Sequence, residues 1–447
     1  MNQNKNTSKY KLQDIQEPNL LREMFSYTEL PKVEFDGKSV AMAPAEQMWI
    51  TDTTFRDGQQ ARPPYTVQQI VDLFELESKL DGGAGILRQS EFFLYSKKDR
   101  EAVDRCRELG RQFPEVTGWI RAVKSDFKLV KEMKLAETGI LVSCSDYHIF
   151  LKLRKTRKQA MEQYLDVVRA ALDSGIRPRC HFEDITRADF YGFVVPFAIE
   201  LMKLRESYGI DVKIRICDTM GYGVPWAEAE LPRSVPKLVS GLIREAGVPS
   251  ELLEWHGHND FHKVLVNPAT AWLYGCSATN CSLLGIGERT GNTPLEAMVV
   301  ELAQLRGQDP KVNYQAITEI AEYYRNEIGY SIPHNFPLVG RDFNTTRAGI
   351  HADGLIKSQE IYTAFDAEKI LGRGVGVAIT DKSGAAGIKH WLDANYGTNL
   401  RKDDPRLQAI RAKVDAEYES GRCTAISDEE MHAWQTEIFE DEQDAGT

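Results

Sequence analysis

The chain has 447 residues, of which 42% are hydrophobic and 27% are charged, and its formal net charge is −11. This length predicts one large unit of about 250 to 300 residues with a smaller region beside it. The negative charge disfavours nucleic acid and anionic membranes as partners, and no apolar run reaches the roughly 20 residues of a membrane span.

The start of the chain, MNQNKNTSKYK, has no apolar stretch behind its lysines and so lacks the form of a secretory signal. The seven cysteines are odd in number and include no C-x-x-C pair, which is typical of reduced thiols. We therefore expect a cytoplasmic protein.

Residues 1–47 form an N-terminal extension of mixed character, to which we assign no function. From about residue 48, short β-rich runs alternate with helical patterns such as 67–80 and 157–172, which indicates a parallel sheet of βα units. The predicted strands are Met48–Thr54, Gly85–Phe92, Val116–Val123, Gly139–Ser145, Arg177–Glu183, Val212–Thr219, Leu253–His258 and Ala278–Gly285. Eight such units predict an α/β fold, the closed TIM (β/α)₈ barrel.

We place the barrel at residues 48–308, and the pattern changes after it. Residues 309–375 begin with a helical stretch that prolines and glycines then interrupt, which predicts a linker and a first subdomain. Residues 376–447 predict a second, helical subdomain with an acidic tail. A smaller, mainly helical C-terminal region should therefore follow the barrel.

Polar residues gather where the predicted strands end, which is where barrels of this kind carry their chemistry. Residues two apart on a strand point to the same side, so His256 and His258 can reach one metal ion. Alone, the pair could also be buried histidines with ordinary hydrogen bonds. Asp57 follows the first strand and Asn292 a glycine-rich turn after the eighth, and closure of the barrel brings both near the histidines. One carboxylate, two imidazoles and an amide oxygen would leave open positions on a divalent ion.

Four ordered segments, DTTFRDGQQ, HGHND, GIGERTGN and RAGIHADG, resemble the isopropylmalate synthase and homocitrate synthase family of barrel metalloenzymes. The resemblance runs from about residue 48 to about residue 395. It implies an acyltransferase that condenses acetyl-CoA, as co-substrate, with a 2-oxo acid. It also implies a divalent metal, Mn²⁺ or Mg²⁺ with Co²⁺ and Zn²⁺ as alternatives, bound by Asp57, His256 and His258 with Asn292 as a ligand or close neighbour.

The resemblance also implies roles for residues around the strand ends. Arg56 would contact the oxygen of the reacting carbonyl, and Thr219 the carboxylate of the oxo acid. Glu183 is one candidate for the base that takes a proton from the acetyl methyl group. Arg121 and His148 match positions that reach the substrate cavity. Arg121 and His148 could instead each form a salt bridge at the rim of the barrel.

His351 and Tyr362 resemble a histidine and a tyrosine that family members insert into the active site of the partner subunit. The pair is the second candidate for the base. The match implies a homodimer with shared active sites. If it misleads, the two residues only pack a helical subdomain.

Three polar residues depart from the usual family pattern: Arg88 and Gln89 on the second strand and His181 on the fifth. Because an apolar pocket should not carry unpaired polar groups, we interpret them as contacts for an extra substrate carboxylate. Oxaloacetate, which would give citrate and CoA, meets that requirement. Phe55 and Gln59 are also similar to the Re-face-specific citrate synthases of the family.

Other functions stay open at this point. Homocitrate synthase or 2-isopropylmalate synthase activity would use 2-oxoglutarate or 2-oxoisovalerate. A related acyl-CoA lyase or aldolase would use a similar metal site to cleave instead of join. A non-catalytic barrel that binds metal and serves as a partner protein is the alternative outside catalysis.

Overall fold

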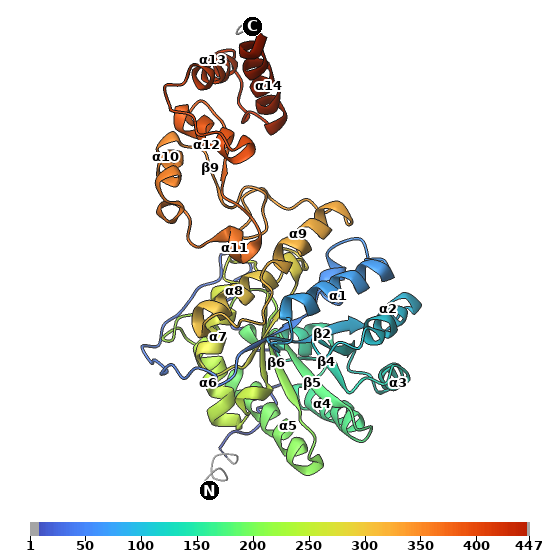
Figure 1. Ribbon diagram of the computed structural model, residues 1–447. Coiled ribbons are helices and arrows are strands. Elements are labelled where there is room, and N and C mark those ends of the chain that lie inside the picture. The colour runs from blue at the N-terminus through green and yellow to red at the C-terminus, as the bar shows by residue number, and fades with distance from the viewer. Residues whose placement is uncertain (1–8, 445–447) are drawn as a thin grey trace. The chain divides into compact units, whose positions relative to one another are not determined.

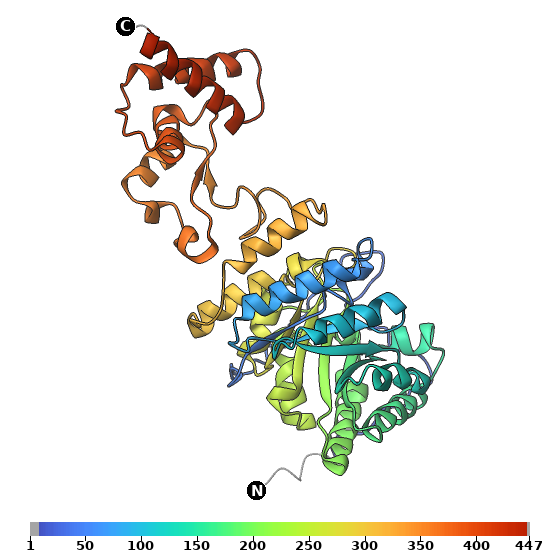
Figure 2. The ribbon, with the colours of Figure 1, turned by 45° about the vertical axis from the view of Figure 1, so that its right-hand side comes forward.

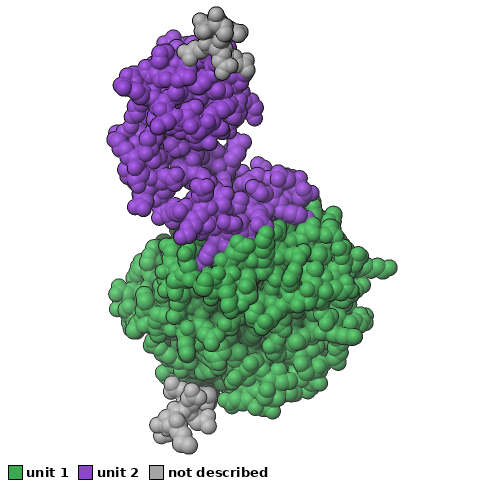
Figure 3. Space-filling view, viewed as in Figure 1, with its two compact units in different colours: residues 1–313 green, residues 314–447 purple. Residues whose placement is uncertain are grey.

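The computed structural model describes residues 9–444, in two compact units that meet in sequence between Asn313 and Tyr314 (Figure 3). Within the described residues, no helix combines the length and the apolar character needed to cross a membrane.

The first unit is a closed barrel of eight parallel strands in sequence order, with helices around it (Figures 1 and 2). The strands are β1 (Trp49–Asp52), β2 (Leu87–Phe93), β3 (Glu115–Ile120), β4 (Glu137–Ser143), β5 (Arg177–Glu183), β6 (Lys213–Asp218), β7 (Leu253–Gly257) and β8 (Ala278–Cys281). Pairing of β1 with β8 closes the ring. The predicted fold class is confirmed.

The helices of this unit begin at capping residues that the sequence supplies. Thr66 and Thr156 each accept a hydrogen bond from a backbone N–H three residues on, while a glutamine there bonds back, and each thus forms a capping box. The helices are α1 (Val67–Asp81), α2 (Lys97–Glu108), α3 (Phe127–Glu132), α4 (Arg157–Leu172), α5 (Val195–Tyr208), α6 (Val235–Ala246), α7 (Val266–Leu273) and α8 (Leu295–Arg306).

Alternate side chains of a strand face the helices and the lumen of the barrel. On β5, Phe182 stacks on Phe197 of α5 with ring centroids 5.1 Å apart. The alternate residues Arg179 and His181 are buried and bonded to lumen side chains. Because the side-chain period of a strand is two, one strand serves both surfaces. The apolar layer holds the helices, and the lumen is left for charged groups.

The N-terminal extension, for which the sequence suggested no role, lies along the loops that follow β4 and β6. The backbone N–H of Asn19 donates to Asp146 Oδ2 at 2.7 Å, and the Tyr147 hydroxyl donates to the Leu20 carbonyl at 2.8 Å. Arg233 donates to the Pro31 carbonyl at 3.1 Å. These bonds tie the extension to segments at the carboxyl ends of the strands.

The second unit is mainly helical, with one two-stranded parallel sheet. Its elements are α9 (Ala316–Asn326), β9 (Thr345–Thr346), α10 (Gly349–Lys357), α11 (Ala367–Leu371), β10 (Gly376–Val377), α12 (Gly384–Tyr396), α13 (Pro405–Glu419) and α14 (Asp428–Asp444). The helix α14 takes in most of the expected acidic tail, whose last three residues lie outside the described part of the chain.

One buried core of this unit takes in residues from both sides of residue 375. Ala352 and Leu355 of α10 share one buried core with Val377, Trp391 and residues of α13. A core needs apolar side chains from several elements, and the helices after residue 376 do not bury theirs without α10. Residues on both sides of 375 therefore form one folded body.

Candidate functional site

Asp57, His256 and His258 lie together at the carboxyl ends of β1 and β7, and the ligand atoms that they offer are all within 4.8 Å of one another. The two histidine Nε2 atoms are 3.3 Å apart. Asp57 Oδ2 lies 3.9 Å from His256 Nε2 and 3.7 Å from His258 Nε2. Ligand atoms about 2.1 Å from a shared metal ion stand roughly 3 to 3.5 Å apart. The three side chains, each 6% exposed, thus form a triangle of nearly the required size.

The orientation of His256 is set by Asn280 on the neighbouring strand β8. His256 Nδ1 lies 2.8 Å from Asn280 Oδ1, so Nδ1 carries the proton and Nε2 keeps its lone pair. The Asn280 amide in turn donates to Thr51 Oγ1 at 2.9 Å, which fixes which way it faces. Sequence reasoning missed Asn280, because only the register that pairs it with His256 shows the contact.

Both imidazoles are in the form that binds metals. Burial and the neighbouring His258 lower the pKa of His256 to about 3, and burial also lowers the pKa of His258. The rings are therefore neutral at pH 7. Among the described residues His258 Nδ1 has no hydrogen-bond partner.

Asp57 is held ionised beside them. Burial opposes its charge, but Arg56, whose Nη1 lies 3.0 Å from Asp57 Oδ1, and the two imidazoles outweigh burial and lower the pKa of Asp57. The Asn292 amide donates to Asp57 Oδ2 at 2.6 Å, and its Oδ1 is buried without a partner among the described residues. Gly287 lies against this amide, since a Cβ there would meet Asn292 at 2.6 Å.

This donor set fits a divalent cation. One carboxylate and two neutral imidazoles match the ligands that Mn²⁺, Fe²⁺, Co²⁺ and Zn²⁺ accept, and they leave positions for a substrate. The orphaned Asn292 Oδ1 is a buried acceptor that a cation or its water would satisfy. The four predicted metal residues are thus brought together, with Asn292 bonded to Asp57.

A second polar group lies at the ends of β4, β5 and β6. His148 Nδ1 stands 3.1 Å from Glu183 Oε2, and the hydroxyl of Thr219 accepts from the backbone N–H of Asp184 at 2.8 Å. Burial opposes the charge of Glu183, but its bond to His148 lowers the pKa of Glu183 to about 2. Lys152 Nζ lies 3.4 Å from Glu183 Oε1 and was not foreseen from the sequence. Three predicted residues, His148, Glu183 and Thr219, thus share one part of the rim.

Glu91 organises the lumen beneath these groups. Its Oε2 accepts from Arg56 Nε and from Arg215 Nη1, both at 3.0 Å. Its Oε1 accepts from Arg179 Nη2 at 2.6 Å and lies 3.2 Å from His181 Nε2. All these side chains are buried. Arg56 is therefore held between Glu91 and the metal-type cluster of Asp57, His256 and His258.

The sequence argument for an extra substrate carboxylate is not supported by these positions. His181 is bonded to Glu91, which leaves its Nε2 no site for a substrate. Gln89 bonds to Glu115 and Glu137, the first residues of β3 and β4, so it lies at the amino end of the barrel. Arg88 lies over the ring of Trp49 at 4.1 Å and donates to Gln47 Oε1 at 3.0 Å. Because both residues stand near the start of β2, neither reaches the end that carries the chemistry.

Arg121 does lie at the carboxyl end of β3, but its partner is a protein carboxylate. Its Nε stands 3.0 Å from Asp126 Oδ2, and its side chain is 62% exposed. This geometry is that of a rim salt bridge.

His351 and Tyr362 are neighbours within the second unit. His351 lies on α10 and Tyr362 directly follows a short turn of helix after it, with ring centroids 4.4 Å apart. Tyr362 is 46% exposed. The two rings thus form an accessible pair on one surface of that unit.

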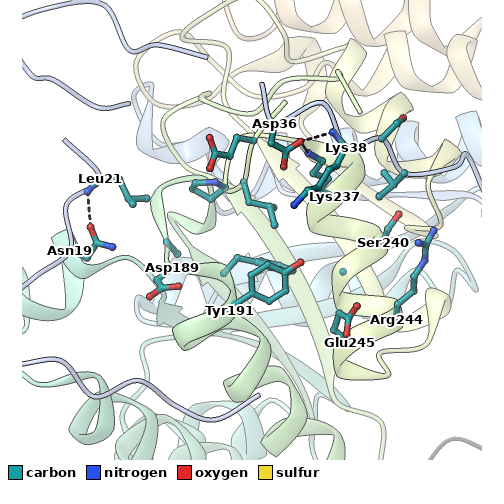
Figure 4. Close-up of a pocket in the computed structure, with 18 residues that line it drawn as sticks. Asn19, Leu21, Asp36, Lys38, Asp189, Tyr191, Lys237, Ser240, Arg244 and Glu245 are labelled. Carbon is teal, nitrogen blue, oxygen red and sulfur yellow. Dashed lines mark hydrogen bonds and ion pairs between the residues drawn. The ribbon is translucent and has the colours of Figure 1, made fainter. Parts of the chain in front are cut away.

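A cavity of about 440 Å³ lies apart from these groups, between the N-terminal extension and α6 (Figure 4). Its charged lining mixes Lys38, Lys237 and Arg244 with acidic residues, and Lys237 is 2.6 Å from Asp36. None of the predicted site residues lines it. We assign it no role in the chemistry.

Comparison with known proteins adds a family to this geometry. A model of the HMGL-like family matches residues 47–323, more than half of the chain. The chain is 59% identical to the citrate (Re)-synthase of Syntrophus aciditrophicus, over 95% of this chain and 68% of that protein. It is 54% identical to the citrate (Re)-synthase of Clostridium kluyveri, over 94% of each chain. A 2-isopropylmalate synthase of Sulfolobus acidocaldarius is more distant, at 28% identity over 86% of this chain and 94% of that protein.

The solved structures support the fold. The hydroxymethylglutaryl-CoA lyase of Bacillus subtilis superposes with a TM-score of 0.52 over 65% of this chain and 97% of that chain, at 18% identity. Barrel, strand-end cluster and relatives together define the class, which is an acyltransferase-like condensing enzyme on a (β/α)₈ barrel. The chain belongs to the HMGL-like family. The predicted family and enzyme type are confirmed.

Proposed function

We propose that this protein condenses acetyl-CoA with oxaloacetate to give citrate and CoA. The observation that carries the proposal is the triangle of Asp57, His256 and His258 beside Arg56, in a chain 54% to 59% identical to two proteins named citrate (Re)-synthase. The substrate follows from those relatives and not from Arg88, Gln89 and His181, whose positions do not support the sequence argument.

Asp57, His256 and His258 would hold the divalent cation, with Asn292 next to it. When bound, the ion would act as a Lewis acid on the carbonyl of the oxo acid. Arg56 has its Nη1 3.0 Å from Asp57 Oδ1, so its guanidinium would stabilise the negative charge that forms on the carbonyl oxygen. Mn²⁺ and Mg²⁺ are our first choices, and Co²⁺ and Zn²⁺ the alternatives.

A base must take a proton from the acetyl methyl group before the new bond forms. The low pKa of Glu183 makes it a weak base, so we assign the proton transfer to His351 with Tyr362. The methyl carbon then bonds to the carbonyl carbon of oxaloacetate, whose oxygen takes up a proton. Water cleaves the thioester, which releases citrate and the CoA thiol. Thr219 and His148 would orient the oxo acid.

We further propose a homodimer in which His351 and Tyr362 act in the active site of the partner subunit. Mixing two inactive variants tests this. A His351→Ala protein and a His256→Ala protein, combined and allowed to exchange subunits, should regain about a quarter of the activity, because one site in the mixed dimer is intact. No recovery in an exchanged mixture would assign both residues to one chain.

We also propose that the protein works in the cytoplasm. All seven cysteines are free thiols, six of them buried, which suits a reducing compartment.

CoA thiol release tests the reaction itself. The protein with Mn²⁺ would be offered acetyl-CoA and, in turn, oxaloacetate, 2-oxoglutarate, 2-oxoisovalerate and pyruvate. Selective turnover of oxaloacetate is the expected result. Preference for another oxo acid would keep the reaction type and discard the substrate, whereas no release with any of them would overturn the proposal.

A further inference from the structure

Oxaloacetate carries a second carboxylate, and the buried arginines of the lumen are each paired with two protein carboxylates, although Arg215 Nη2 has no hydrogen-bond partner among the described residues. Arg179 binds Glu91 and Glu137 at 2.6 and 2.7 Å, and Arg215 binds Glu91 and Glu254 at 3.0 and 2.7 Å. Taking either arginine from its partners would leave buried carboxylates unpaired, which is costly. The cation for the second carboxylate should therefore come from the rim.

Three arginines of the rim are also firmly paired. Arg121 binds Asp126 at 3.0 Å, Arg187 binds Asp184 at 2.9 Å and Arg289 binds Asp260 at 2.9 Å. Charge-assisted hydrogen bonds of about 2.7 to 2.9 Å are the strong ones. These three guanidiniums are thus positioned by the protein itself.

Lys152 differs from them in its contacts. Its Nζ lies 3.4 Å from Glu183 Oε1 and 3.4 Å from His148 Nδ1, both longer than a strong charge-assisted bond, and its side chain is 54% exposed. An ammonium on a flexible four-carbon stem can move to a new partner at little cost. Lys152 is therefore a cation beside the proposed site that remains able to bind a ligand.

The segment that carries Lys152 is nevertheless well anchored. Residues Tyr147–Lys152 form a turn of π-helix in the loop after β4, and the preceding Asp146 forms a buried ion pair with Arg157 at 2.8 Å. The N-terminal extension adds the bonds of Asn19 and Leu20 described above. The backbone is thus fixed while the lysine side chain is loosely held.

The strand order places Lys152 at a suitable distance from the metal-type cluster. Glu183 ends β5, and β6 separates that strand from β7, which carries His256. Two strand spacings of about 4.8 Å put Glu183 roughly 10 Å from His256 along the sheet. A four-carbon oxo acid bound at the cluster through its carbonyl end would extend into this gap.

We propose that Lys152 is the specificity-determining residue that binds the second carboxylate of the oxo acid. The inference rests on the proposed function and names the substrate contact that the sequence argument sought at Arg88 and His181. A hydrogen-bonded charge pair of this kind corresponds to about a 10- to 100-fold preference for a dicarboxylate.

The test replaces Lys152 with methionine, which keeps an unbranched side chain one atom shorter and removes the charge. Lys155→Met is the matched control, because Lys155 lies three residues on and donates to Gln163 instead. We expect Lys152→Met to lower kcat/KM for oxaloacetate about 10- to 100-fold. The KM for acetyl-CoA should stay unchanged, as should the affinity for pyruvate, which lacks the second carboxylate and is measured as substrate or competitive inhibitor.

Three results would decide against the inference. An equal loss with oxaloacetate and pyruvate would mean that Lys152 acts only through Glu183. No loss with oxaloacetate, or the same loss in Lys155→Met, would remove Lys152 from the site. Failure of the unaltered protein to use oxaloacetate would instead contradict the proposed function. Lys152→Arg, which keeps the charge, should recover part of the oxaloacetate activity.

Discussion

The barrel interior holds two polar groups that differ in how their charges are matched. In the lumen, Glu91 and Glu254 accept from arginines at 2.6 to 3.0 Å. In the strand-end cluster, Asp57 accepts from Arg56 and Asn292, yet its Oδ2 and the two histidine Nε2 atoms also face one another at 3.3 to 3.9 Å, as ligands of one ion do. Matched buried charges stabilise one arrangement of the chain, whereas neighbouring acceptor atoms without a shared donor can bind a cation. Burial alone therefore does not mark a functional site.

The largest expected effect comes from breaking the cluster. His256→Ala removes one imidazole, and loss of the ion's contribution should lower the condensation rate by about 10³-fold or more. CoA thiol release and Mn²⁺ titration followed by electron paramagnetic resonance would measure it. His432→Ala, in the second unit, is the control. Normal activity with normal Mn²⁺ affinity in His256→Ala would show that the cluster is not the metal site.

Breaking the lumen network should instead lower the free energy of unfolding. Glu91→Gln leaves Arg56, Arg179 and Arg215 without their shared carboxylate, and unpairing a buried charge costs about 3 to 5 kcal/mol. Urea unfolding would measure the change in the free energy of unfolding, with the exposed Glu228→Gln as the control. A change below about 1 kcal/mol would mean that the network contributes little to the fold.

Acid should destabilise the fold through the buried carboxylates of the lumen. Burial opposes the charges of Glu137 and Glu254, but Lys213 in one case and Arg215 in the other lower their pKa values to about 2. A carboxyl whose folded pKa is depressed stabilises the fold above its unfolded pKa of about 4.3 and loses that contribution as pH falls toward 2. Each group should contribute about 3 kcal/mol that is lost between about pH 5 and pH 2.

Unfolding measured at several pH values would check this loss. In Glu254→Gln the free energy of unfolding should fall less steeply over that range, because one titrating carboxyl is absent. An identical slope in the variant and the unaltered protein would show that Glu254 does not carry the acid dependence.

The smallest expected effect concerns the neighbour that orients the cluster. Asn280→Ala removes the acceptor of His256 Nδ1, and loss of such a partner lowers metal affinity about 10- to 100-fold. Calorimetric Mn²⁺ titration would measure it, and Asn280→Asp, which keeps an acceptor, should retain most of the affinity. Equal affinity in Asn280→Ala would mean that β8 does not orient the ring.

Much of this molecule could be predicted from local patterns. The alternation of β-rich and helical stretches predicted eight strands and a closed barrel, because each βα unit buries its own apolar faces in a repeating way. The spacing of His256 and His258 predicted a shared ligand position, since alternate residues of a strand face the same side. Asp57 and Asn292 followed from the closure of the barrel.

The sequence did not show the depth of a residue along its strand or its partners across strands. Arg88 and Gln89 were assigned to the substrate although they begin β2, and Glu91 two residues on reaches Arg56. Asn280 and Lys152 carried no sequence signal. Their contacts depend on how far one strand is shifted against the next, which no single segment encodes.

By itself, the sequence determined the barrel and the metal-type residues, because both depend on short-range periodicity and on the order of strand ends. Only the tertiary structure decided that His181 faces Glu91, that residues 19–32 bind the loops after β4 and β6, and that Lys152 is loosely held. The physical reason is that barrel closure sets the register of all eight strands together. A side chain's partner across the lumen is therefore a property of the whole ring.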